Sequence, residues 1–207
     1  MSIGTALSNK TILIVLLAFI STAIFSQEMN TIFSKGNSGS ASTGAYGGPL
    51  VQATQLANNW GLSIGGKGGV IINQRFAFGG IGIGAGSDYS FVGDNFIDDA
   101  NASLNVSYGA GGIFAEYISD LTNSIHFSVP INFMAGGVSI KDNDIDIESS
   151  GVFIIEPGVN LEFNLTESLI PGITFSYKQF MGSSLDNLND KDLSGMSIGI
   201  VFKFGNF

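Results

Sequence analysis

The sequence predicts an all-β protein, an eight-stranded antiparallel up-and-down transmembrane β-barrel that follows a cleavable signal peptide. Three observations predict this fold: an apolar leader, eight segments in which alternate residues are apolar, and a composition poor in charge and rich in glycine. Charged residues make up 12% of the 207 residues, about half the share usual in soluble domains. Glycine takes 29 positions, and a water-facing surface would be hard to build from this mixture.

The leader has the pattern of an export signal. Lys10 precedes the apolar run TILIVLLAFISTAIF at residues 11–25, which ends at the small and polar residues Ser26 and Gln27. That order of charge, apolar run and small residues is typical of a signal peptide, and the run is shorter than the ~20 apolar residues of a transmembrane helix. We therefore expect a signal peptide at 1–26, a flexible lead-in at 27–42 and the barrel at 43–207.

Eight segments read as strands because side chains alternate across an extended chain. Apolar residues occupy every second position most clearly in four of them, near 125–133, 153–165, 169–177 and 196–204. The other four lie near 43–54, 60–72, 75–86 and 102–118. Eight is an even number, as single-chain bacterial outer-membrane barrels require.

Two features interrupt this pattern. The apolar phase slips by one residue at Gly79–Gly80 and again near Gly111–Gly112, which predicts β-bulges. Pro130, Pro157 and Pro171 fall inside predicted strands. Because proline cannot donate to a strand ladder, they predict further bulges or a shifted register.

A lipid-facing exterior explains the alternation better than a soluble, lipocalin-like barrel does. A soluble barrel of this kind would carry charge on its outer face, whereas here the face opposite the apolar one is mostly Gly, Ser, Asn and Thr. Short and long links also alternate along the chain, as in outer-membrane barrels. The short links fall near 73–75, 119–123 and 166–168, and the long ones near 87–101, 141–150 and 182–192, with the link near 56–59 as an exception.

With this topology the aromatic residues form two girdles, one at each rim of the barrel. The predicted periplasmic girdle comprises Phe76, Phe78, Tyr117, Phe127, Phe163, Phe202 and Phe204. The predicted outer girdle comprises Trp60, Phe153, Tyr177 and Phe180.

The leader, the eight alternating segments, the strand GLSIGGKGGVIIN and the final strand MSIGIVFKFGNF resemble the small OmpA/OmpX-type outer-membrane β-barrel class over residues 43–207. The resemblance implies the outer membrane of a Gram-negative bacterium, with the lipid bilayer and the outer-membrane insertion machinery as partners. Members of the class end in an aromatic assembly signal. Here the alternation ends at Phe204 and leaves Phe207 out of phase, so either residue is a candidate for that signal.

Charge is balanced on the face predicted to line the lumen. That face carries the lysines Lys67, Lys178 and Lys203 and the glutamates Glu116, Glu156 and Glu162. Because buried charges must be paired, this balance predicts a plugged interior with a polar network and no open pore.

The only histidine, His126, lies two residues from Ser128 on the same predicted face. This His-x-Ser pattern resembles that of outer-membrane lipid A deacylases, in which an acid completes a nucleophilic triad. The alternative is that the two side chains only pack in the lumen. Packing is favoured because both residues are predicted at the periplasmic end, away from an outer-leaflet substrate.

Most of the acidic residues gather in the predicted long links, which hold 11 of the 17. In one of them Asp142, Asp144, Asp146 and Glu148 alternate, so an extended loop would present four carboxylates on one side. Oxygen ligands of this kind suit Ca²⁺ or Mg²⁺, although the EF-hand spacing is missing. A solvated acidic loop is the default interpretation, with contact to surface polysaccharide through divalent cations as the alternative.

Three functional classes follow from the sequence. The first is a non-enzymatic envelope scaffold that displays acidic loops for structural, adhesive or partner-binding work. The second is a narrow channel, and the third is a lipid-modifying hydrolase that uses His126 and Ser128. No cofactor is expected, the net charge of −9 argues against nucleic acid, and the absence of cysteine excludes a disulfide scaffold.

Overall fold

The computed structural model describes residues 43–207 apart from 58, 91–102, 143–144 and 187. The predicted signal peptide at 1–26 and lead-in at 27–42 lie outside the described residues. Within the described part of the chain, no helix is both long and apolar enough to cross a bilayer.

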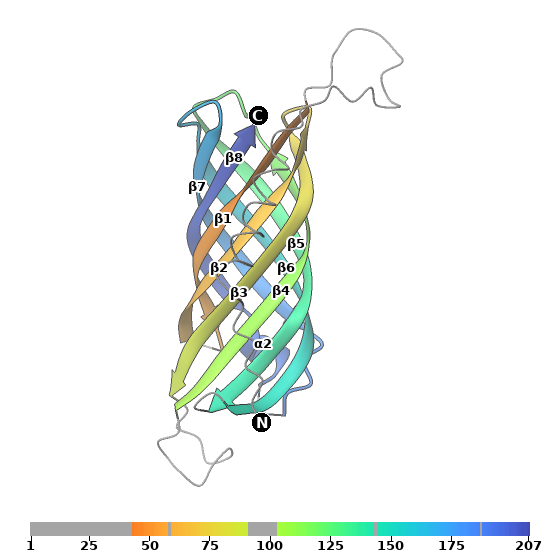
Figure 1. The fold of residues 1–207 in the computed structure, drawn as a ribbon, viewed down its shortest axis with the longest axis vertical. Helices are drawn as coiled ribbons and strands as arrows, with labels where there is room; N and C mark the ends of the chain where they lie inside the picture. The colour runs from red at the N-terminus through yellow and green to blue at the C-terminus, as the bar shows by residue number, and fades with distance from the viewer. Residues whose placement is uncertain (1–42, 58, 91–102, 143–144, 187) are drawn as a thin grey trace, which may run out of the picture. The chain divides into compact units, whose positions relative to one another are not determined.

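The described chain forms a closed antiparallel β-barrel in which each strand pairs with the next and β8 pairs with β1 (Figure 1). This confirms the predicted fold class and strand number. The strands are β1 (Thr43–Leu56), β2 (Asn59–Ile72), β3 (Phe76–Ser90), β4 (Ser103–Ile118), β5 (Ile125–Asp142), β6 (Ile145–Phe163), β7 (Leu169–Met181) and β8 (Gly195–Asn206), with the short helix α2 (Asp190–Leu193) before β8.

Large apolar side chains cover the outside of the barrel, as the alternation predicts. On β5, Phe127 and Phe133 point outward and are exposed, whereas His126 and Asn132 point inward and are buried. Neighbouring residues face opposite sides of the wall on the other strands too, and large apolar residues are exposed on each of them, although toward the loop end apolar residues such as Ile83 also face inward. The barrel therefore has an apolar exterior and charged groups in its lumen.

The two ends of the barrel differ. At the end that we call the turn end, the strands are joined by the short links 73–75, 119–124 and 164–168. At the opposite end, the loop end, β3 to β6 extend beyond their neighbours. Pairing between β2 and β3 stops at Leu62 and Gly86, whereas β3 and β4 stay paired as far as Ser90 and Ser103.

The predicted long link at 141–150 is wrong. β5 runs to Asp142 and β6 begins at Ile145, so most of that segment is strand. The sequence pattern was misleading because Asp142, Asp146 and Glu148 read as loop residues, whereas a hairpin that projects beyond its neighbours tolerates such polar residues on its strands. The long link at 182–194 is present and contains α2.

The predicted bulges at Gly79–Gly80 and Gly111–Gly112 are also wrong, because the registers of β2, β3, β4 and β5 are continuous there. On β3 the apolar residues change sides while the strand stays regular. Phe76 and Phe78 face outward, and Ile81 and Ile83 face the lumen. The single register shift within the described pairs lies between Ile140 and Lys141.

The prolines leave the register unchanged as well, contrary to the expectation from the sequence. Between β5 and β6 the pairing is interrupted around Pro130 and resumes at Ile131 and Pro157 in the same register. Pro171 pairs with Phe202 without interruption. Local loss of ladder pairs is therefore enough to accommodate a residue that cannot donate.

Apolar side chains fill the lumen toward the loop end. Ile83, Tyr108 and Ile154 are buried there, and Phe180 packs edge-on against Tyr108 with ring centroids 5.2 Å apart. Phe180 is thus part of this core and does not belong to the outer girdle in which the sequence placed it. The link between β7 and β8 closes the core with three further buried side chains, Leu185, Leu188 and Leu193.

Candidate functional site

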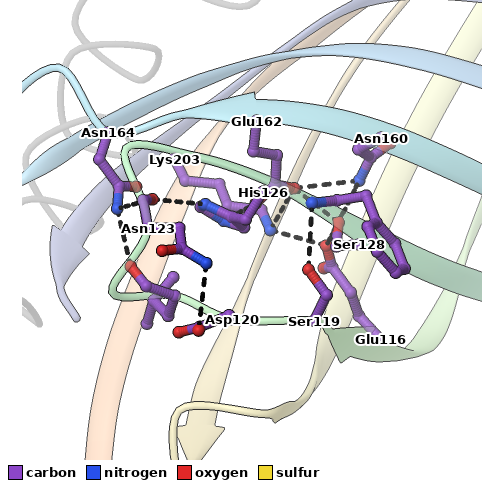
Figure 2. A network of polar contacts seen from close by, with 12 residues as sticks. Glu116, Ser119, Asp120, Asn123, His126, Ser128, Asn160, Glu162, Asn164 and Lys203 are labelled. Carbon is purple, nitrogen blue, oxygen red and sulfur yellow. Dashed lines mark hydrogen bonds and ion pairs between the residues drawn. The ribbon is translucent and has the colours of Figure 1, made fainter.

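Charged residues of the lumen form a buried group near the turn end, which we call the turn-end cluster. It comprises Lys67 and four residues that Figure 2 labels, Glu116, Glu162, Lys203 and His126. Lys203 Nζ lies 2.6 Å from Glu116 Oε1 and 2.7 Å from Glu162 Oε1. Lys67 Nζ lies 2.8 Å from Glu116 Oε2, and His126 Nε2 lies 3.1 Å from Glu162 Oε2. Both carboxylates are therefore met by cations, as buried charges require.

Neutral polar groups complete the coordination of the two carboxylates. Tyr46 donates its hydroxyl hydrogen to Glu116 Oε2 at 2.7 Å. The Ser128 hydroxyl lies within donating distance of Glu116 Oε1 and Glu162 Oε1, at 2.5 and 2.7 Å. Asn160 Nδ2 donates to Ser128 Oγ at 3.0 Å. This dense set of charge-assisted bonds holds the side chains of four strands in one arrangement.

A second ion pair lies farther from the turn end, and we call it the mid-barrel pair. Lys178 Nζ lies 3.0 Å from Glu156 Oε1 and also donates to Gln52 Oε1 and Ser197 Oγ, each at 2.8 Å. Ser176 donates to Glu156 Oε1 at 2.7 Å. Each of the six charged residues that the sequence placed in the lumen thus lies in an ion pair within one of these two groups.

His126 and Ser128 share the lumen face, but the structure does not join them as a nucleophile and its base. Among the described residues, the hydrogen bonds of Ser128 run to Glu116, Glu162 and Asn160. His126 Nε2 faces Glu162, and its Nδ1 lies 3.4 Å from the carbonyl oxygen of Asn123. Both side chains are buried, so the geometry gives no support to the hydrolase alternative.

The structure describes the side chains of only two of the four acids of the predicted acidic loop, Asp146 and Glu148, and gives each a partner of its own. Asp144 and the side chain of Asp142 lie outside the described residues, Asp146 lies 3.3 Å from Lys141, and Glu148 Oε1 accepts from the backbone N–H of Asp186 at 2.6 Å. No group of three or more potential metal-ligating side chains occurs within the described part of the chain. A divalent site at this loop therefore stays a prediction.

Sequence reasoning missed two contributions to the plugged lumen. Tyr46 lies on the inward face of β1, where its parity with the buried Gln52 would have placed it. The leucines of the β7–β8 link were read as part of a polar loop. Their presence among Asp and Asn residues was the available signal, because isolated leucines in a polar link usually pack against something.

No protein-family model matches the sequence, and no curated protein sequence matches it significantly. Solved structures do resemble the barrel. The crystal structure of Neisserial surface protein A (NspA) aligns with a TM-score of 0.53 and 11% identity, covering 80% of this chain and 99% of that chain. The N-terminal β-barrel domain of Pseudomonas aeruginosa OprF aligns with a TM-score of 0.49 and 10% identity, covering 80% and 98%.

A third structure, Ail of Yersinia pestis in complex with the heparin analogue sucrose octasulfate, aligns with a TM-score of 0.45 and 10% identity, covering 80% of this chain and 98% of that chain. At such identities a structural likeness speaks for the fold alone. From the closed strand order and the likeness to NspA, the chain has the fold of the small eight-stranded outer-membrane β-barrels.

Proposed function

We propose that the protein is an integral β-barrel of the outer membrane of a Gram-negative bacterium and acts there as a non-enzymatic scaffold. It holds the segments of its loop end at the cell surface for structural, adhesive or partner-binding work. The observation that carries this proposal is the division of the wall into an apolar exterior and a closed lumen whose charged residues are paired with one another.

The exterior is far too apolar for a protein surrounded by water. Trp60 is 58% exposed, Phe153 is 65% exposed and Phe175 is 49% exposed, and they belong to a continuous population of outward Ile, Leu, Val and Phe side chains on all eight strands. Contiguous apolar surface of this extent marks contact with a membrane or a partner. Because it encircles the barrel, the partner is the bilayer, where the strands satisfy their own backbone groups.

The loop end faces the cell exterior in this proposal. Outer-membrane barrels carry short turns on the periplasmic side and longer connections outside, and the two longest links of this barrel, 91–102 and 182–194, both lie at the loop end. Beyond the apolar zone, the outward faces of β5 and β6 carry the small or polar residues Gly137, Ser139, Ser149 and Gly151, with the exposed Ile147 as the apolar exception. Such a surface suits the part of the wall that rises above the hydrocarbon into water.

A scaffold fits the lumen better than a channel does. The turn-end cluster, the mid-barrel pair and the apolar core under Leu185, Leu188 and Leu193 follow one another along the barrel. An ion would have to displace paired charges and then cross an apolar layer, and each step is costly for a desolvated charge.

The insertion machinery is a partner during biogenesis in this proposal, and Phe204 is the aromatic residue available to it. Phe204 points outward and is exposed. By contrast, Phe207 stacks on Tyr46 with ring centroids 6.4 Å apart. An aromatic side chain that packs on the barrel itself is poorly placed for recognition from outside.

Gel migration of the refolded mature chain tests the membrane barrel. After refolding in detergent, the unheated protein should migrate differently from the boiled protein and should show the circular dichroism of β structure. Cell fractionation should recover it with outer-membrane markers. A helical spectrum, or a chain that stays soluble without detergent, would refute the proposal.

Conductance in planar bilayers tests the scaffold against the channel. The refolded protein should give no single-channel currents of porin size, and a general porin reconstituted in parallel provides the positive control. Regular porin-sized steps that depend on the protein would overturn the plugged lumen and favour the channel.

A further inference from the structure

A small cavity lies in the lumen between the turn-end cluster and the mid-barrel pair. Its volume is about 20 Å³, and its polar lining includes Lys67 and Asn160 on one side and Asn132, Glu156 and Gln52 on the other. The cavity is thus walled by residues of both ionic groups.

Asn132 presents an unpaired acceptor at this cavity. Its Nδ2 donates to Glu156 Oε2 at 3.0 Å, whereas its Oδ1 is buried and has no protein donor within hydrogen-bonding distance. The residue is only 6% exposed. A buried polar atom without a partner costs roughly 1–3 kcal/mol, so a group that donates to Asn132 Oδ1 is strongly favoured here.

The size and charge of the site define what can fill it. A cavity needs roughly 10–15 Å³ to hold one water molecule, so about 20 Å³ accommodates a water and excludes larger solutes. The lumen already pairs three lysines with three glutamates. A metal cation would add an uncompensated buried charge, which is costly, and a neutral occupant adds none.

We propose that this cavity is a binding site for a single structural water molecule that donates to Asn132 Oδ1. A buried water typically makes about three hydrogen bonds, and the walls offer both donors, such as Lys67 and Asn160, and acceptors, such as Glu156. The water links the turn-end cluster to the mid-barrel pair. The two ionic groups therefore act as one polar plug.

Solution NMR of the refolded barrel in detergent micelles tests this site directly. The side-chain amide protons of Asn132 should show cross-peaks to water with the sign of a long-lived complex, because the water sits beside the amide group. An assigned Asn132 amide without such cross-peaks would overturn the proposal. Shifts of that amide on titration with Na⁺ or K⁺ at constant ionic strength would do so too, because they would indicate a cation.

A cavity-filling variant locates the water. Val201 lines the cavity, so Val201→Leu should abolish the Asn132 cross-peaks to water. The matched control is Val138→Leu, which enlarges a buried valine outside this cavity and should leave the cross-peaks in place. Cross-peaks that persist in Val201→Leu would place the water elsewhere and overturn the assignment. The wild-type spectrum decides the matter even if either variant fails to fold.

Discussion

Lys203 of β8 and Glu116 of β4 meet across the lumen, with Nζ 2.6 Å from Oε1. The two strands lie on opposite sides of the closed strand order, so this ion pair joins opposite walls of the barrel. The same ammonium group lies 2.7 Å from Oε1 of Glu162 on β6. One ammonium group thus lies between two buried carboxylates that would otherwise repel each other, while Lys67 pairs with Glu116 as well.

Replacing Lys203 by methionine should destabilise the barrel severely. The variant leaves Glu116 and Glu162 buried near each other with one cation fewer, and breaking a buried pair costs about 3–5 kcal/mol. Urea unfolding in lipid vesicles measures the loss. Lys141→Met is the control, because Lys141 and Asp146 form a largely exposed pair and should lose only about 0–1 kcal/mol. Equal losses in the two variants would contradict the role of Lys203.

The folding free energy lost to an arginine substitution on the outer face should depend on the position of the residue along the barrel axis. Phe175 faces outward between Val159 and Ile198 in the apolar zone. Phe175→Arg should cost about 2–4 kcal/mol of folding into vesicles, as arginine does near a bilayer midplane. Ser149→Arg, on the projecting part of β6, should cost about 0–1 kcal/mol. A small cost at both positions would mean that hydrocarbon does not surround the barrel.

The sequence was sufficient to predict the fold because the alternation reports directly which side chains face the lumen. His126, Ser128, Glu156 and Lys178 were each placed on the inward face by parity alone, and each is buried there. Parity also brought the six lumen charges to one interior. It could not say which lysine meets which glutamate, because that depends on the strand stagger around the whole barrel.

Prediction from the sequence failed where an apolar or aromatic residue can either face the lipid or pack in an apolar core. The change of apolar phase at Gly79–Gly80 was attributed to a bulge, yet the strand is regular and the residues beyond it, Ile81 and Ile83, line an apolar core at the loop end. A shift of the apolar positions by one residue looks the same in the sequence whether a bulge turns the strand or the apolar side chains move from the outer face to the lumen. Phe180 was misplaced for the same reason, because an aromatic near a rim serves equally as a girdle residue or as a core residue.

Replacing glycine by alanine should change the free energy of unfolding differently on the inner and outer faces of the barrel wall. A Cβ at the inward-facing Gly199 would lie 2.1 Å from the carbonyl oxygen of Val51, whereas a Cβ at the outward Gly82 would meet nothing within 4 Å. Gly199→Ala must therefore push strands apart and should lower the free energy of unfolding. Gly82→Ala should be neutral or stabilising by up to about 1 kcal/mol. Urea unfolding of both variants compares them, and the reverse order would refute the close packing of β1 against β8.

The turn at 119–124 should make the stability of the barrel depend on pH through Asp120. The Thr122 hydroxyl donates to Asp120 Oδ1 at 2.7 Å, with a second bond from the Thr122 backbone N–H at 3.1 Å. The hydroxyl bond is the main reason that the pKa of Asp120 lies below its ordinary value. Because the folded-state pKa is depressed, Asp120 stabilises the turn above the unfolded-state pKa, and this contribution is lost as the pH falls through the folded-state pKa.

Thr122→Val tests this interpretation of the turn, because it removes the hydroxyl and keeps the side-chain shape. The pKa of Asp120, followed by NMR titration of its carboxyl carbon, should rise toward the ordinary value, since a hydrogen bond to the charged form favours that form. Thr166→Val is the matched control, because Thr166 accepts from Ser168 in another turn and should leave the Asp120 titration unchanged. If the pKa of Asp120 is the same in Thr122→Val as in the wild type, the hydroxyl bond does not hold it down, and the acid dependence of this turn must arise from other groups.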